Sequence, residues 1–160
     1  GGLQALFLDL ETDERYQPLV HQHLSPYPHV AQGKWLANYP EVHAMMDVSD
    51  GINSDLPHIL KASHKKATIF LDKLPISNTL LTFCKDQDIH SEELATSGGE
   101  DYVLLLTIQK EAFNKIADKF MDQFQTPLYP IGEIGPGEPE IIYYRNNQKI
   151  QSQKKGFSHF

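Results

Sequence analysis

Hydrophobic positions along the chain alternate between helical spacing and short apolar runs of strand length. Helical spacing predicts helices at residues 3–10, 19–24, 30–37, 52–60, 77–86 and 110–124. Apolar runs predict strands at residues 42–48, 67–71, 102–108, 129–134, 141–144 and 149–151. The run at 102–108 is nearly continuous and indicates a central strand, whereas the pattern at 87–95 is ambiguous. Interleaved strands and helices, with turns at 135–137 and 146–147 forming hairpins near the end, predict an α+β sheet covered by helices.

Composition and charge narrow the classes of function. A chain of 160 residues with 40% hydrophobic residues suits one globular domain. Its apolar runs are too short to cross a bilayer and no basic and apolar leader opens it, so we expect a cytoplasmic protein. Cys84 is the only cysteine, which excludes an internal disulfide and a thiolate-rich zinc site. The net charge of −7 disfavours nucleic acid or an anionic membrane as partner, and an anionic phosphate ligand would need a divalent metal between itself and the protein.

The first candidate site is the sequence MMDVSDG at residues 45–51, between a predicted strand and a predicted helix. Asp47 and Asp50 stand three positions apart with Ser49 between them, and such a cluster can hold a hard cation. Alternatively, Asp50 or Ser49 is only the N-cap of the helix, worth about 1 kcal/mol, and Asp47 is a solvated carboxylate. The spacing disfavours a phosphatase of the haloacid dehalogenase type, which needs Asp-x-Asp.

The second candidate site is the sequence SGGEDY at residues 97–102, just before the predicted central strand. It is either an ordinary turn with solvated Glu100 and Asp101 or a loop that binds a ligand. Neither a dinucleotide fingerprint nor a P-loop occurs in the chain. His21 and His23 are not expected to bind metal, because residues two apart on a helix do not share a face.

The aromatic tail GFSHF at residues 156–160 is the third stretch. Such a tail is usually a plug of the core, although Phe157 could equally stack on a flat heterocycle.

MMDVSDG, SGGEDY and GFSHF, in this order and with Leu74-Pro75-Ile76 between the first two, resemble the C-terminal half of the thiamine-monophosphate kinases. These kinases belong to the aminoimidazole ribonucleotide synthetase superfamily, and the resemblance covers roughly residues 3–160. It implies a mixed β-sheet covered by helices, like the C-terminal domain of that superfamily. It also implies a two-domain protein, a homodimer at full length. An N-terminal domain absent from this chain would supply most ATP and Mg²⁺ ligands and the dimer interface.

The activity implied by the resemblance is transfer of the γ-phosphoryl group of ATP to thiamine monophosphate, giving thiamine diphosphate. No covalent intermediate and no general base are expected, because the acceptor is already an anionic phosphate. Carried over to this sequence, Asp47 and Asp50 would be Mg²⁺ ligands and Ser49 would contact the nucleotide phosphates.

The resemblance places the residues that bind thiamine on the motifs SGGEDY and GFSHF. Glu100 or Asp101 would bind the thiamine substrate, and Phe157 would lie against one of its rings. Val103 departs from the family, which usually has a second glutamate there. We expect the isolated chain to be inactive. The alternatives are a non-catalytic ligand-binding or assembly domain, or a superfamily relative such as an amidine-forming ligase or a selenide kinase.

Overall fold

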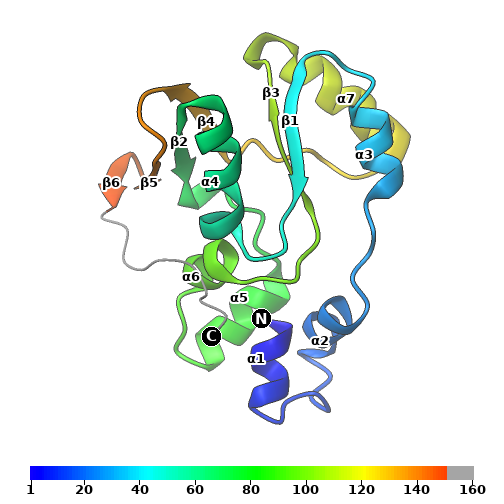
Figure 1. Cartoon of the computed structure of the whole chain (residues 1–160). Coiled ribbons are helices and arrows are strands. Elements are labelled where there is room, and N and C mark those ends of the chain that lie inside the picture. The colour runs from blue at the N-terminus through cyan, green and yellow to red at the C-terminus, as the bar shows by residue number, and fades with distance from the viewer. Residues whose placement is uncertain (151–160) are drawn as a thin grey trace.

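The computed structural model describes residues 1–150 and has the predicted α+β character (Figure 1). Its helices are α1 (Gly2–Phe7), α2 (Gln17–Leu24), α3 (Val30–Leu36), α4 (Ile52–Ser63), α5 (Asn78–Asp86), α6 (Ser91–Ser97) and α7 (Phe113–Phe124), with 3-10 turns η1 (Leu71–Lys73) and η2 (Lys110–Ala112). Its strands are β1 (Val42–Asp47), β2 (Lys65–Phe70), β3 (Leu104–Ile108), β4 (Gly132–Pro136), β5 (Ile141–Arg145) and β6 (Gln148–Ile150). Within this described part, every helix is too short or too polar to cross a membrane.

The strands form two sheets rather than one. β1 and β3 pair antiparallel as a two-stranded sheet, and the other strands form a four-stranded sheet in the order β4-β2-β5-β6. In the larger sheet β2 runs parallel to β5 and antiparallel to β4, so this sheet is mixed, as predicted. Helices cover both sheets, with α3 and α7 beside β1 and β3, and α4 beside β2 (Figure 1).

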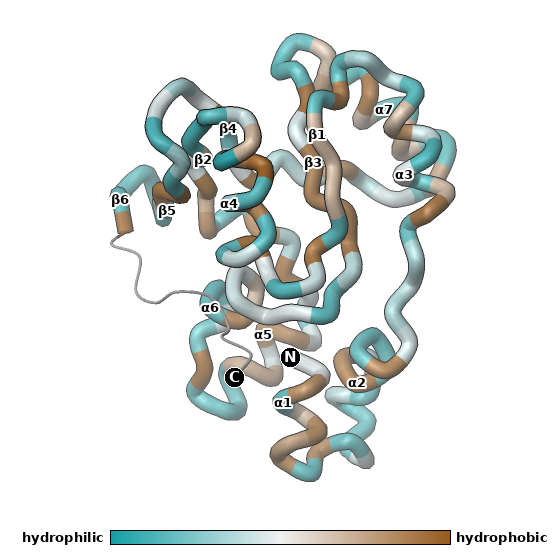
Figure 2. Tube along the Cα trace, in the orientation of Figure 1, coloured by the Kyte–Doolittle hydropathy of each residue, from teal (hydrophilic) through white to brown (hydrophobic). Residues whose placement is uncertain are grey.

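Three separate apolar clusters hold these layers together, and brown segments along β3 and α4 in Figure 2 mark two of them. The first joins α4 to the four-stranded sheet through Leu56, Leu60, Ala67, Ile69 and Tyr143. The second joins α1, α2 and α5 through Ala5, Tyr16, Val20, Phe83 and Cys84. The third joins α3 and α7 to β1 and β3 around Leu36, Ile116 and Phe120. Cys84 is buried in the second cluster, where it packs among apolar side chains.

The prediction of a central strand at 102–108 is wrong. In the described part of the chain β3 pairs with β1 alone, and each of its residues is only partly buried. Its continuous apolar run has another cause, because both of its faces meet apolar side chains. Leu104, Leu106 and Ile108 pack against the cluster of α3 and α7, whereas Leu105 packs against the cluster of α4.

The predicted turn at residues 135–137 is also wrong, because Gly135 and Pro136 lie inside β4. Pro136 pairs with Lys65 at the edge of the sheet, where a residue without an N–H group is tolerated. β4 and β5 form no hairpin, since β2 lies between them. The second predicted hairpin is confirmed: Asn146 and Asn147 both have positive φ and connect β5 to β6.

The predicted cap of α5 is confirmed, whereas the strand predicted at 129–134 begins only at Gly132. The Ser77 hydroxyl caps α5 by accepting a hydrogen bond from the Leu80 N–H at 3.1 Å. The ambiguous stretch at 87–95 contains most of α6, whose last residue is Ser97. The predicted strand at 149–151 is β6, and Gln151 lies outside the described residues.

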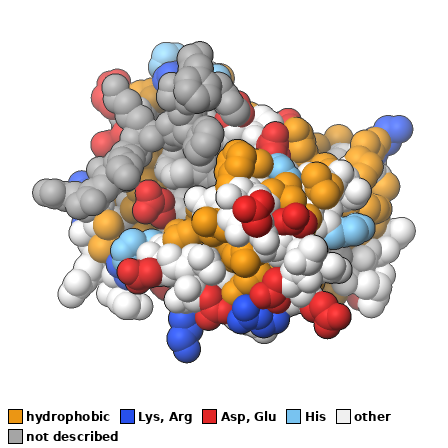
Figure 3. Space-filling view, turned by 90° about the horizontal axis from the view of Figure 1, so that it is seen from below, with side chains coloured by type: hydrophobic (Ala, Val, Ile, Leu, Met, Phe, Trp, Pro, Cys, Tyr) orange, Lys and Arg blue, Asp and Glu red, His pale blue; other side chains and the backbone are white. Residues whose placement is uncertain are grey.

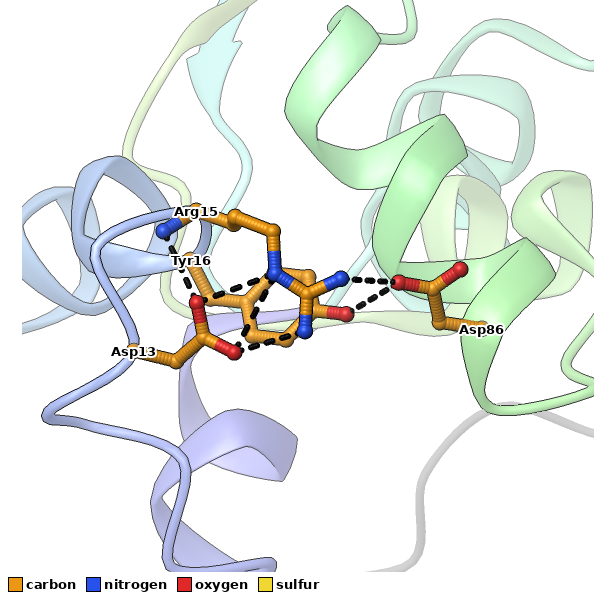
Figure 4. A network of polar contacts seen from close by, with 4 residues as sticks. All are labelled: Asp13, Arg15, Tyr16 and Asp86. Atoms are coloured by element: carbon orange, nitrogen blue, oxygen red, sulfur yellow. Dashed lines mark hydrogen bonds and ion pairs between the residues drawn. The ribbon is translucent and has the colours of Figure 1, made fainter.

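A polar network fixes the segment between α1 and α2 to α5 (Figure 4). The Arg15 guanidinium bridges Asp13 and Asp86 at 2.7 and 2.8 Å. The buried Tyr16 hydroxyl donates to the same Asp86 carboxylate at 2.5 Å, and this hydrogen bond raises the pKa of Tyr16. Seen from below, this end of the molecule also exposes hydrophobic side chains (Figure 3), and Phe7 at the end of α1 and the following Leu8 are exposed. The network therefore holds α2 in a defined position relative to α5.

Candidate functional site

The structure brings the two loop motifs together at the end of the β1–β3 pair. Beyond the strands the two chains stay hydrogen-bonded, because the Val48 N–H donates to the Val103 carbonyl at 2.9 Å and the Tyr102 N–H to the Val48 carbonyl at 2.8 Å. The Glu100 N–H then donates to the Ser49 carbonyl at 2.7 Å. We call residues 47–51 the aspartate loop and residues 98–102 the glutamate loop. The two loops form one continuous surface.

Glycines permit this close approach of two backbones. Gly51 has φ +91°, and a Cβ there would lie 2.9 Å from the Gly98 carbonyl oxygen. A Cβ on Gly99 would lie 2.6 Å from the Ser49 carbonyl oxygen. Real Cβ atoms do not come so close to backbone atoms, so both positions need glycine.

The start of α4 disproves the N-cap interpretation of Asp50 and Ser49. The N-cap is Gly51, which has no side chain to cap with. Asp55 in the first turn, only 3% exposed, instead binds the residue before the N-cap, because its carboxylate accepts a hydrogen bond from the Asp50 N–H at 3.0 Å. This bond fixes the Asp50 backbone while its side chain reaches the surface, and Asp47 at the end of β1 is exposed as well.

The carboxylates of Asp47 and Asp50 fit one part of a magnesium site. Their oxygens are the hard donors that Mg²⁺ prefers, and both side chains are accessible. Among residues 1–150, however, no three His, Cys, Asp or Glu side chains gather closely enough to hold a metal ion. Octahedral Mg²⁺ would therefore need further ligands, such as phosphate oxygens and water.

Two partly buried hydrogen bonds, which no sequence pattern indicated, form a relay that fixes the α6 end just before the glutamate loop. The Asn53 amide donates to the Ser97 hydroxyl at 2.8 Å, and the Tyr143 hydroxyl donates to the Asn53 side-chain oxygen. Tyr143 is 6% exposed, and its burial raises the pKa of the phenol to about 12. The relay ties the last residue of α6 to the first turn of α4 and to β5.

The acidic residues of the glutamate loop differ in their surroundings. The Glu100 carboxylate pairs with the ring of His23 from α2, with 3.1 Å between Oε2 and Nδ1. Asp101 keeps exposed surface, yet nearby protein atoms desolvate its carboxylate and raise its pKa, against the opposing effect of His23. Glu100 and Tyr102 have positive φ, which is costly for residues other than glycine and marks a strained loop.

His23, Phe157 and Val103 differ in how the structure bears on their expected roles. The sequence assigned no role to His23, and its contact with Glu100 could not be found from a pattern because the two residues lie on different elements. Phe157 lies outside the described residues, so neither its role as a core plug nor its stacking on a ligand is tested. Val103, where the family usually has glutamate, is 42% exposed beside the glutamate loop.

Comparison with known proteins confirms the resemblance of the motifs. Residues 10–145 match the family described as AIR synthase related protein, C-terminal domain. The chain is 39% identical over 145 residues to the thiamine-monophosphate kinase of Buchnera aphidicola subsp. Acyrthosiphon pisum, covering 89% of this chain and 42% of that protein. It is 32% identical over 161 residues to the thiamine-monophosphate kinase of Aquifex aeolicus, covering 100% of this chain and 47% of that protein.

A solved structure extends this similarity to the fold. The structure described as AaThiL complexed with AMPPCP and TMP matches with a TM-score of 0.78 at 31% sequence identity, covering 99% of this chain and 47% of that chain. The chain thus spans less than half the length of the relatives it matches. Because the family match extends over residues 10–145, the chain belongs to the AIR synthase related protein family and is its C-terminal domain.

Proposed function

We propose that the protein containing this domain transfers the γ-phosphoryl group of ATP to thiamine monophosphate and so produces thiamine diphosphate. The carrying observation is the match over 99% of this chain to a structure complexed with AMPPCP, an ATP analogue, and TMP. Relatives named thiamine-monophosphate kinase at 32–39% identity give it further support.

The geometry of the two loops supports a phosphoryl transfer between neighbouring ligands. The aspartate loop would hold the metal-bound nucleotide phosphates, with Asp47 and Asp50 as Mg²⁺ ligands and Ser49 beside the phosphates. The glutamate loop would hold the acceptor through Glu100 or Asp101. Because these loops are hydrogen-bonded to one another, donor and acceptor would be placed side by side.

The chemistry in this proposal is positioning and charge neutralisation. The acceptor oxygen belongs to a phosphate that is already ionised, so no side chain has to remove a proton. Bound Mg²⁺ would neutralise charge that develops on the transferred group, an effect worth several kcal/mol. The side chains of this chain hold the metal and orient the acceptor, and backbone bonds between the loops limit their relative motion.

Several features of the whole protein belong to the same proposal. An N-terminal domain would complete the ATP and Mg²⁺ sites, since this chain spans only 42–47% of its relatives. The isolated chain would then be inactive, and the intact protein would be a homodimer. The tail residue Phe157 would lie against a ring of thiamine. The cytoplasmic location stays a prediction that the lone Cys84 supports.

A coupled assay of ADP formation on the intact protein tests the proposal. We expect ADP release with thiamine monophosphate that depends on Mg²⁺, and none above background with aminoimidazole precursors. Preference for an aminoimidazole substrate would instead assign the domain to another activity of the superfamily. Binding of ligands without turnover would favour a non-catalytic domain.

A further inference from the structure

The glutamate loop has one side-chain contact with α2 that the proposed function does not use. His23 Nδ1 lies 3.1 Å from Glu100 Oε2, and the imidazole is 15% exposed whereas the carboxylate is 49% exposed. The mostly buried partner is therefore the histidine, and the accessible partner is one of the two acids proposed to meet the substrate.

The position of His23 is fixed by the packing of α1 against α2. A Cβ on Gly2 would lie 2.2 Å from the Leu19 carbonyl oxygen and 2.6 Å from the Cβ of His23, so the α1 backbone abuts α2 at this point. On the other side of the segment, Arg15 and Tyr16 bind Asp86 of α5 (Figure 4). His23 consequently projects from an anchored helix, whereas Glu100 projects from a loop.

The contact with His23 restricts the direction of the Glu100 side chain, which the backbone hydrogen bonds do not fix. The Glu100 N–H is bound to the Ser49 carbonyl at 2.7 Å, which fixes the main chain but not the direction of a long side chain. The contact places the ring nitrogen beside Oε2, which leaves Oε1 as the oxygen that can meet a ligand. Glu100 thus presents one oxygen in a defined direction.

We propose that His23 is a positioning residue: its Nδ1, 3.1 Å from Oε2, pairs with the Glu100 carboxylate and orients it so that Oε1 faces the acceptor. The inference rests on the proposed function for the identity of that acceptor. The orientation of Glu100 itself depends only on the contact between α2 and the glutamate loop. His23 acts through Glu100 and touches no reacting atom.

Steady-state kinetics of the intact protein test the effect on the acceptor. His23→Ala should raise KM for thiamine monophosphate about five- to tenfold, because it removes one contact that orients Glu100, and leave KM for ATP and kcat unchanged. His23→Asn, whose Nδ2 replaces the ring donor, should restore most of the loss. His21→Ala is the matched control, because His21 lies on the same helix and is exposed.

A double-variant cycle separates this role from a general loss of structure. If His23 acts through Glu100, His23→Ala should have no further effect on KM in a Glu100→Ala background. Additive effects of the two substitutions would overturn the proposal. So would equal behaviour of His23→Ala and His23→Asn, or an unchanged KM in His23→Ala.

A spectroscopic measurement tests whether His23 contacts Glu100, even if the protein does not phosphorylate thiamine monophosphate. In ¹⁵N spectra of the intact protein, His23 Nδ1 should carry a proton, and Glu100→Ala should change that signal while leaving the His21 signal unchanged. An identical His23 signal in both proteins would overturn the positioning role. Absence of turnover together with the expected signal would overturn only the proposed function.

Discussion

Gly51→Ala should separate the two loops, and the structure allows its cost to be worked out. Gly51 has φ +91° and ψ 156°, a region that is essentially restricted to glycine, and another residue there costs on the order of 1–3 kcal/mol. The new Cβ would also lie 2.9 Å from the Gly98 carbonyl oxygen, 3.0 Å from the Ser97 carbonyl carbon and 3.1 Å from the Thr96 carbonyl oxygen. Because these are backbone atoms, the glutamate loop must move. We expect a total loss of about 2–4 kcal/mol of unfolding free energy.

Urea unfolding of the chain measures this loss as a shift of the midpoint at constant slope. Thermal unfolding should show a fall in Tm of roughly 5–15 °C, since each kcal/mol shifts a domain of this size by about 2–4 °C. Gly135→Ala in β4 is the matched control, because a Cβ there would meet nothing within 4 Å. Its φ is not in the left-handed region, so alanine should be neutral or stabilise by about 0.5 kcal/mol.

The outcome that would refute this reasoning is a Gly51→Ala variant that loses less than about 1 kcal/mol, well below the cost of strain and contact together. Such a result would mean that the two backbones do not approach each other as described. In the intact protein the same variant should also lose activity, because the aspartate and glutamate loops would no longer be held together.

Three further predictions concern the metal, an alkaline transition and a helix cap. Asp47→Asn and Asp50→Asn should each lower turnover of the intact protein at limiting Mg²⁺, and unchanged turnover in both would refute the metal assignment. Tyr143, with its pKa raised from 10.0 to about 12, should contribute stability that is present below pH 10 and lost as the pH rises toward 12. Tyr143→Phe should cost about 1 kcal/mol of unfolding free energy at neutral pH. In urea unfolding at increasing pH, this variant should lose less stability between pH 10 and 12 than the unsubstituted protein. Ser77→Ala should destabilise the chain by about 1 kcal/mol in the same assay at neutral pH, and no change would exclude the cap.

Sequence patterns predicted those features whose cause lies within a few neighbouring residues. The apolar spacing of α7, the Ser77 cap and the Asn146-Asn147 turn each depend on local backbone preferences, and all three are present. The turn expected at Gly135-Pro136 failed for the opposite reason. Pairing of β4 with β2 decides the conformation there, and that pairing involves residues far away in the sequence.

The candidate site was predictable as two motifs but not as one surface. Acidic residues after a strand and a glycine-rich turn before another strand were visible in the sequence. Their adjacency depends on backbone bonds such as that from Glu100 to Ser49, which no local pattern encodes. The same limit explains why His23 and Tyr143 were missed, since each contributes through a partner on another element.

The bond between Asn53 and Ser97 has a consequence for the order in which the domain folds. The two residues are 44 positions apart, and the β1–β3 pair beside them closes a longer stretch of chain. Closing such a loop costs entropy before native contacts compensate for it, so these pairings should form after the local helices. The aspartate and glutamate loops would therefore meet only late in folding. A partly folded chain would expose its carboxylates without a formed binding surface.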